Sequence, residues 1–161
     1  MSKGYYAINP THKKEGFLLR DPTKWETRFL ELAKTVAKWS KDPSTKCGAV
    51  ITKGKNKVIG IGYNGFARGM SDDTDLYNDR DEKLSRVIHA EMNAIFNSAT
   101  DLTGCTMFTT IPPCERCAVH VITTGIKLWV MGSPTPEQEK RWNFSKSYQF
   151  LREAGVDIIK V

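Results

Sequence analysis

Two short stretches, His89-Ala90-Glu91 and Pro113-Cys114-Glu115-Arg116-Cys117, decide how this chain folds and what it binds. Cys114 and Cys117 are three residues apart at an expected helix start, so their sulfurs should share one face of that helix. The positive end of the helix dipole also favours thiolates there. One imidazole and two thiolates have the softness that zinc prefers. We therefore expect His89, Cys114 and Cys117 to hold zinc.

Three protein ligands would leave the fourth tetrahedral position free, which is typical of catalytic rather than structural zinc. Water bound there loses its proton near neutral pH and becomes a nucleophile. His120, three residues after Cys117, could close the site only if it reached back about 4.5 Å along the helix axis. We expect instead that His120 packs in the structure or faces solvent.

Glu91 is the candidate general acid and base, because a carboxylic acid beside zinc can carry protons if its pKa is raised. Residues two apart in a helix point about 200° apart, so periodicity alone does not place Glu91 beside His89. The two side chains could still converge if His89 stands at the very first turn. The sequence leaves this point open.

Outward from these motifs, apolar spacing predicts alternating helices and strands. Thr23 and Glu26 form a capping box at the start of the first helix. Its apolar face should contain Trp25, Phe29, Leu32, Val36 and Trp39. We expect helices at about 23–40, 89–98, 114–124 and within 137–154, a hairpin of 48–52 and 58–62, further strands at 106–110, 127–131 and 157–161, and a long loop at 63–85.

This order predicts a three-layer α/β domain at residues 23–161, preceded by an N-terminal arm at residues 1–22. The length of 161 residues suits one domain. The sequence has no apolar run of the roughly 18 residues that a membrane span needs and no signal peptide, so we expect a cytoplasmic protein.

Charge and cysteine content add weaker expectations. The net charge of +6 favours anionic partners such as nucleotides or nucleic acid, although scattered lysines are equally consistent with a solvated basic surface. Cys47 and Cys105 stand singly beside apolar residues and are expected in the core. Disulfides are not expected in a reducing compartment.

The pattern H-x-E followed by P-C-x-x-C is the signature of zinc deaminases acting on cytosine or adenine. Over about residues 23–161 the chain resembles the deoxycytidylate (dCMP) deaminases of the cytidine/deoxycytidylate deaminase family. The narrower resemblance rests on SKDPS at 40–44, GAVI at 48–51, GIGYNG at 60–65, SDD at 71–73, HAEMNAI at 89–95 and PCERCA at 113–118.

The resemblance implies a cytidine-deaminase-like α/β/α fold with a five-stranded mixed sheet. It implies hydrolysis of dCMP to dUMP and ammonia, which supplies dUMP for thymidine nucleotide synthesis. Zinc activates water for attack at C4, and Glu91 protonates N3 and then the amine. The resemblance also implies a hexamer, activation by dCTP and inhibition by dTTP, with Mg²⁺ a possible companion of the regulatory nucleotide. The resemblance includes relatives that hold a second, structural zinc through Cys and His in the long loop. Residues 63–88 contain neither residue type, so we expect one zinc ion per chain.

Further site residues follow from the same resemblance, each with a structural alternative. Asn64 matches a sugar-contacting asparagine but would also suit a tight turn. The substrate phosphate is assigned, by position and charge, to Lys41, Ser44 and Lys46. The regulatory nucleotide is assigned to Gly62, Tyr63, Asn64, Gly65 and Arg68. Asn64 is thus assigned to two roles that the sequence does not separate.

Three rival functions remain open at this point. A tRNA or single-stranded DNA deaminase would share the zinc motif, but the acidic residues between 72 and 82 would repel a strand, so we expect no nucleic-acid partner. A zinc-stabilised binding module would not need Glu91. Another free cytosine nucleotide, such as dCTP, could replace dCMP as the substrate.

Overall fold

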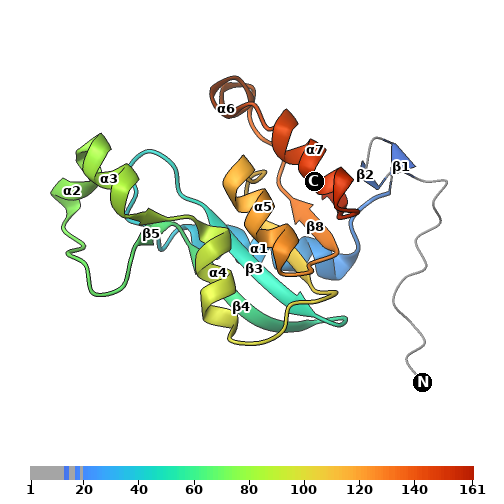
Figure 1. Cartoon of the computed structure of the whole chain (residues 1–161). Helices are drawn as coiled ribbons and strands as arrows, with labels where there is room; N and C mark the ends of the chain where they lie inside the picture. Colours follow the sequence, from blue (N-terminus) through green and yellow to red (C-terminus); the bar gives the residue numbers. More distant parts are fainter. Residues whose placement is uncertain (1–12, 15–16, 19) are drawn as a thin grey trace.

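A mixed β-sheet organises the computed structural model, which describes residues 13–14, 17–18 and 20–161 (Figure 1). The strand order is β1-β2-β9-β8-β7-β3-β4. The five longer strands are β3 (Gly48–Lys53), β4 (Lys57–Tyr63), β7 (Thr106–Thr109), β8 (Leu128–Met131) and β9 (Asp157–Lys160). Strands β7, β8 and β9 are parallel, whereas β3 is antiparallel to both neighbours.

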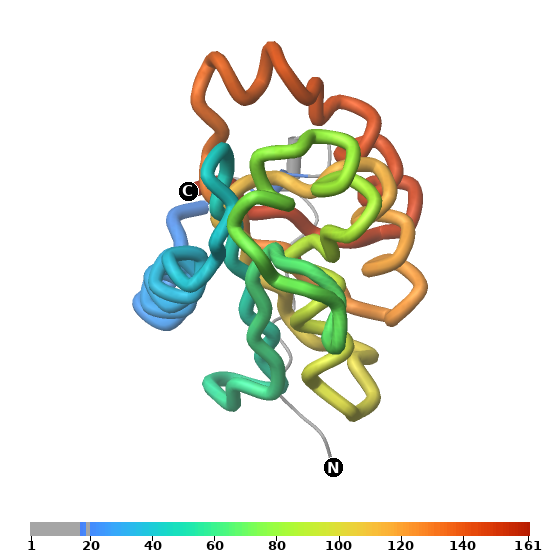
Figure 2. The backbone as a smooth tube through the Cα atoms, turned by 90° about the vertical axis from the view of Figure 1, so that its left-hand side faces the viewer, coloured from blue at the N-terminus to red at the C-terminus, as the bar shows by residue number. Residues whose placement is uncertain are grey.

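Helices cover both faces of this sheet, as the sequence predicted. Helix α1 (Lys24–Ala37) lies alone on one face, and α4 (Ala90–Ser98), α5 (Glu115–Thr123) and α7 (Ser145–Glu153) lie on the other (Figure 2). The period-2 geometry of a strand explains the two cores. Ile51 and Trp129 pack towards α4 and α5, whereas Val50 and Val130, their neighbours, pack towards α1.

Helix α1 begins where its sequence predicts. The Thr23 side chain accepts a hydrogen bond from Glu26 N, and the Glu26 carboxylate accepts one from Thr23 N, which completes the capping box. The helix ends at Ala37, so Trp39 falls in the following turn. Trp39 is therefore 53% exposed rather than part of the core face, and its ring meets Tyr63 edge-on.

Two segments are more structured than expected. The predicted loop at 63–85 contains β5 (Gly65–Phe66), α2 (Thr74–Asn78) and α3 (Arg80–Arg86), and β6 (Val87–Ile88) follows it. The single helix expected within 137–154 is two helices, α6 (Pro136–Trp142) and α7. Asn143, with φ of 44°, ends α6 in the left-handed conformation.

The expected N-terminal arm lies largely outside the described residues. Its described part adds β1 (Lys13–Lys14) and β2 (Phe17–Leu18), and β2 pairs with β9 in parallel. Leu18 is buried in the core beneath α1. Among the described helices, none has the length and apolar character to cross a membrane.

Candidate metal centre and adjoining cavities

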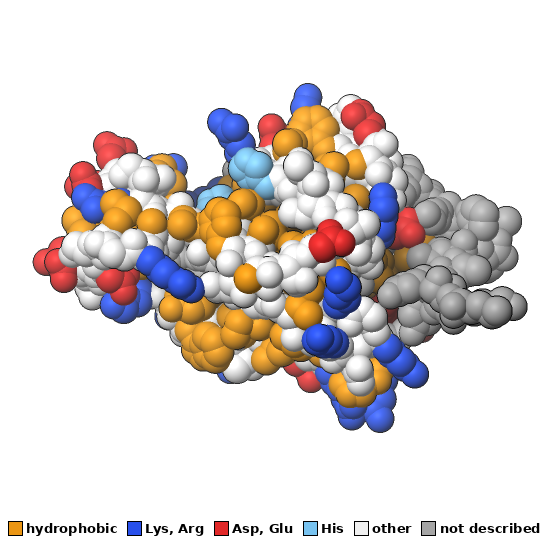
Figure 3. All heavy atoms as spheres, turned by 60° about the horizontal axis from the view of Figure 1, so that its bottom comes forward, with side chains coloured by type: hydrophobic (Ala, Val, Ile, Leu, Met, Phe, Trp, Pro, Cys, Tyr) orange, Lys and Arg blue, Asp and Glu red, His pale blue; other side chains and the backbone are white. Residues whose placement is uncertain are grey.

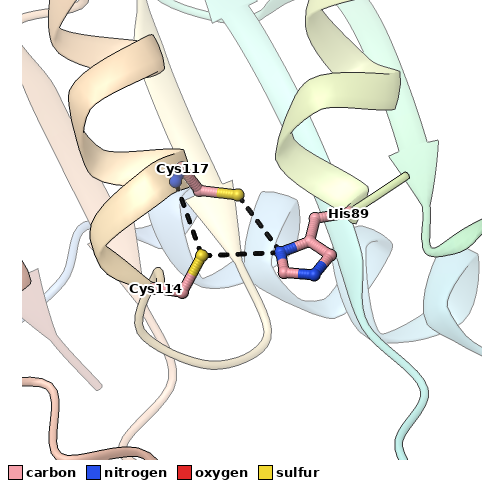
Figure 4. Close-up of side chains that lie close together, drawn as sticks. All are labelled: His89, Cys114 and Cys117. Carbon is pink, nitrogen blue, oxygen red and sulfur yellow. Dashed lines mark hydrogen bonds between the residues drawn. The ribbon is translucent and has the colours of Figure 1, made fainter. Parts of the chain in front are cut away.

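The three expected metal ligands converge from two helix starts (Figure 4). His89 is the N-cap of α4 and Cys114 is the N-cap of α5, both with extended backbone, and Cys117 lies in the first turn of α5. His89 Nδ1 is 3.5 Å from Cys114 Sγ and 3.3 Å from Cys117 Sγ. Tetrahedral zinc would hold a nitrogen and a sulfur about 3.6 Å apart, so these donors fit the ion.

No fourth ligand joins this group among the described residues. The cluster that could hold a metal consists of His89, Cys114 and Cys117, with all donor atoms within 4.8 Å of one another. His120 is exposed on the far part of α5, as expected for a residue outside the site. The arrangement leaves one coordination position for a small molecule such as water.

The two cysteines differ in acidity before metal binds. A hydrogen bond from Cys117, together with the approach of His89, lowers the pKa of Cys114 to about 4 despite its partial burial. Because the Cys117 thiol donates its proton to the Cys114 thiolate, this hydrogen bond, together with burial, raises the pKa of Cys117. The Cys114 thiolate in turn raises the pKa of His89. Because metal ligands must lose their protons, metal affinity should fall as pH falls.

Glu91 lies beside the trio, which resolves the point that helix periodicity left open. His89 precedes the first helical residue, so the helical angle between positions two apart does not apply to this pair. Glu91 is 7% exposed, and its carboxyl contacts the Cys117 thiol. Burial is the main cause that raises the pKa of Glu91. A raised pKa favours the protonated carboxyl, which suits a group that passes protons on.

The metal centre opens into a cavity of about 270 Å³, here called the catalytic cavity. Asn64 and Ser44, two of the expected substrate residues, line it. The Asn64 side chain accepts from Cys47 N at 2.8 Å and donates to Thr45 O at 2.9 Å. Asn64 therefore also holds the 42–47 segment in place. The lining continues through Asp42, Lys83, Leu84, Val87, Ala90, Ile111, Pro112, Arg141, Trp142 and Phe144.

A second cavity, of about 320 Å³, is lined by the neighbours of Asn64 in the turn at residues 62–65 and is here called the turn cavity. Gly62, Tyr63, Gly65 and Arg68, the expected effector residues, line it. The side chain of Asn64, the remaining residue of that set, faces the catalytic cavity instead. The turn residues expected to serve the two roles thus line different cavities.

The expected phosphate ligands are dispersed. Lys41 lines the turn cavity, where it forms an ion pair with Asp72. Lys46 is exposed and lines neither cavity, and Ser44 alone of the three reaches the catalytic cavity. Sequence reasoning did not single out two further lining residues, Lys83 in the expected loop at 63–85 and Arg141 in the helix expected within 137–154.

The two cysteines expected in the core have different surroundings. Cys105 is 1% exposed within the larger core. Cys47 lines the catalytic cavity, where burial, with smaller effects of Glu91 and Asp42, raises the pKa of its thiol to about 12. Cys47 therefore remains a neutral thiol near the metal centre.

Comparison with known proteins agrees with this geometry. Residues 23–133 match the cytidine and deoxycytidylate deaminase zinc-binding region. An uncharacterized deaminase from the luxG 3' region of Aliivibrio fischeri is 40% identical over 84% of this chain and 92% of that protein. Human deoxycytidylate deaminase is 42% identical over 66% of this chain. That match covers 64% of the human protein, slightly less than two thirds of its length.

A solved structure shares the fold at low sequence identity. The dCMP deaminase of cyanophage S-TIM5, solved with dCMP and dUMP, superposes with a TM-score of 0.68 at 19% identity. The superposition covers 88% of this chain and all of that one. At this identity the likeness establishes a common fold of sheet and flanking helices, which confirms the α/β fold class expected from the sequence. The expected count of five strands was wrong, because β1 and β2 extend the sheet to seven.

Proposed function

The chain belongs to the cytidine and deoxycytidylate deaminase family, and from this premise we propose that it hydrolyses dCMP to dUMP and ammonia. The observation that carries the proposal is the three-ligand centre of His89, Cys114 and Cys117 with the buried Glu91 beside it. A zinc-stabilised binding module would not require a buried carboxyl at that place. The deoxycytidylate deaminases among the relatives support dCMP as the substrate.

Each group has a distinct chemical part in this proposal. Zinc held by the trio would act as the Lewis acid that makes water nucleophilic near neutral pH. Glu91 takes one proton from the attacking water and delivers it to the ring nitrogen N3. It then takes the second proton from the hydroxyl formed at C4 and delivers it to the amine, which leaves as ammonia when the C4–N bond breaks. Burial suits this work, because it raises the pKa of Glu91 towards the working pH. Asn64 orients the substrate sugar and Ser44 faces the same cavity.

A substrate panel tests the activity directly. Cytidine, deoxycytidine, CMP, dCMP, dCTP and a cytosine-containing oligonucleotide are incubated with the zinc-loaded protein, and ultraviolet absorbance reports the loss of cytosine. We expect the highest kcat/KM for dCMP. A preference for nucleosides would mean that the protein does not recognise the substrate phosphate. Turnover of the oligonucleotide alone would make the protein a nucleic-acid deaminase.

A single substitution tests the role of Glu91. Glu91→Gln should retain zinc and the fold but lose roughly 10²- to 10⁴-fold in kcat, the usual contribution of a general acid and base. Glu115→Gln, in the exposed first turn of α5, is the matched control and should turn over normally. Wild-type turnover in Glu91→Gln would exclude Glu91 from the proton transfers.

We further infer that the turn cavity binds regulatory nucleotides, with dCTP as activator and dTTP as inhibitor in a hexamer. Glycine allows an anion to approach the backbone closely. Gly65 offers such an approach, because the nearest atom to the place of its missing side chain is Tyr63 Cε2 at 3.6 Å, whereas at Gly62 that place is taken by α4. Both glycines line the cavity together with the cations of Lys41 and Arg68. Asp72, which also lines the cavity, would face a magnesium ion carried by the nucleotide.

Initial rates with and without dCTP or dTTP test the regulatory role, and sedimentation of the protein tests the hexamer. No response to either nucleotide would contradict the regulatory role.

A further inference from the structure

Two cationic side chains reach the catalytic cavity from elements that the metal site does not use. Apart from His89, the cations among its described lining residues are Lys83 and Arg141. Lys83 belongs to α3 and Arg141 to α6, and both helices lie beyond the ends of the central sheet (Figure 1). Neither residue has a part in the chemistry at the metal, so their presence in the cavity needs a separate explanation.

The ammonium of Lys83 is fixed at the cavity wall. Its side chain is 15% exposed, and Nζ lies 3.3 Å from both Asp42 Oδ1 and Ser44 Oγ. Asp42 is also the acceptor for Ser44 N at 2.8 Å and Thr45 N at 3.2 Å. An ammonium has three donors. The contacts with Asp42 and Ser44 therefore leave Lys83 one N–H for a further acceptor in the cavity.

Arg141 stands at the cavity on an aromatic support. Its guanidinium carbon lies 5.1 Å from the centre of the Trp142 ring, within the range of a cation–π contact. Trp142 and Phe144 line the same cavity, because the left-handed Asn143 turns the chain between them. A guanidinium that is oriented in this way keeps several N–H donors for an anion.

Charge balance makes this wall the anion-attracting side of the cavity. Two thiolates would offset the charge of a zinc ion, and Lys83 offsets Asp42. Glu91, the other acidic lining residue, lies at the metal end of the cavity against Cys117. Among the described residues, Arg141 forms no ion pair with Glu91 or with Asp42. Lys41 and Lys46, the lysines that the sequence suggested for the substrate phosphate, lie outside this lining.

We propose that Lys83 and Arg141, assisted by the Ser44 hydroxyl, bind the 5'-phosphate of the substrate and make the enzyme select a nucleoside monophosphate over the nucleoside. This inference rests on the proposed function and names the residues that determine its specificity. The base lies at Glu91 and the metal centre, while the phosphate lies against α3 and α6. Discrimination between dCMP and deoxycytidine then depends on α3 and α6, which lie outside the P-C-x-x-C motif.

The test compares dCMP with deoxycytidine in the zinc-loaded protein. Lys83→Met and Arg141→Gln should each lower kcat/KM for dCMP at least about tenfold, mainly through KM, because each loses a charged hydrogen bond. The values for deoxycytidine should stay at the wild-type level. Lys83→Arg should restore most of the preference. Arg80→Gln on α3 and Lys140→Met on α6 are exposed controls that line neither cavity and should keep it.

Equilibrium binding separates this inference from the proposed function. Calorimetry with dUMP and deoxyuridine requires no turnover, and Lys83→Met should weaken dUMP binding while deoxyuridine binding is retained. Equal losses for both ligands would mean that Lys83 only supports the 42–47 segment, and unchanged dUMP binding would exclude a phosphate contact. If wild-type protein deaminates no cytosine compound, the proposed function fails; if it deaminates dCMP but these variants keep the preference, only the phosphate assignment fails.

Discussion

Gly62 on β4 lies directly beneath α4, and its replacement by alanine tests how the sheet sets the position of the catalytic groups. A Cβ at Gly62 would lie 2.3 Å from Ala94 N and 2.5 Å from Ala90 O. Both are backbone atoms of α4, the helix that begins at His89 and contains Glu91. No side-chain rotation can relieve such an overlap, so the helix itself must move.

The size of the effect follows from these distances. Atoms in ordinary contact are 3.4 Å or more apart, so α4 must shift by about 1 Å. Overpacking of this kind costs roughly 1–3 kcal/mol, and an overlap with backbone belongs at the upper end of that range. For a domain of this size, about 3 kcal/mol corresponds to a loss of about 6–12 °C in Tm. The same shift separates His89 from the two cysteines and should lower turnover about 100-fold.

Thermal unfolding of the zinc-loaded protein and kcat/KM for dCMP measure the two effects, with Gly65→Ala as the matched control. A Cβ at Gly65 would meet Tyr63 Cε2 at 3.6 Å, an ordinary contact, although Gly65 belongs to the same turn. Gly65→Ala should change the free energy of unfolding by no more than about 0.5 kcal/mol. Wild-type Tm and turnover in Gly62→Ala would refute the claim that β4 determines where α4 lies.

Three further outcomes are expected. Cys114→Ser should lower bound zinc well below one equivalent by metal analysis, whereas Cys105→Ser, a change in the core, should retain it. Glu26 loses part of its hydration on burial, but hydrogen bonds from Arg20, at 2.8 Å to each carboxylate oxygen, and from the helix N-terminus outweigh this and lower its pKa. The stability that ionised Glu26 gives is present above its unfolded pKa of about 4.3 and is lost as pH falls through the lower folded value. Glu26→Gln should therefore lower the free energy of unfolding by about 1–2 kcal/mol at pH 7 and leave it unchanged at pH 2, as measured by denaturant unfolding. Ala99 ends α4 with φ of 47°, so Ala99→Gly should raise the free energy of unfolding by about 0.5–1 kcal/mol, and a decrease would contradict the strain.

The parts of the fold that the sequence predicted are those that depend on neighbours along the chain. The capping box of Thr23 and Glu26 is complete within one turn, so its residue types suffice to place the start of α1. Cys114 and Cys117 are likewise fixed by one helix start. The break at Asn143 was not predicted: one helix was expected within 137–154, and the structure has α6 and α7 there.

Lys83 and Arg141 show why the rest of the site could not be predicted. Each contacts the catalytic cavity through packing between segments that are distant in the chain. On a sequence, Lys83 is one of many lysines, and only its approach to Asp42 and Ser44 distinguishes it. Charge type and position along the chain therefore suggested Lys41, within the SKDPS motif, and Lys46, just after it, but neither lines the catalytic cavity.

Asn64 explains how one short turn can take part in two sites. Its side chain holds the segment that lines the catalytic cavity, through Cys47 N and Thr45 O, while Gly62 and Gly65 on either side face the turn cavity. Its backbone carbonyl accepts from Ser40 Oγ at 2.7 Å, which ties the turn to the residues just before Asp42. A ligand that moved the turn would therefore move the amide of Asn64 and, with it, the 42–47 wall of the catalytic cavity. Coupling between the two cavities then requires no path longer than this one residue and its hydrogen bonds.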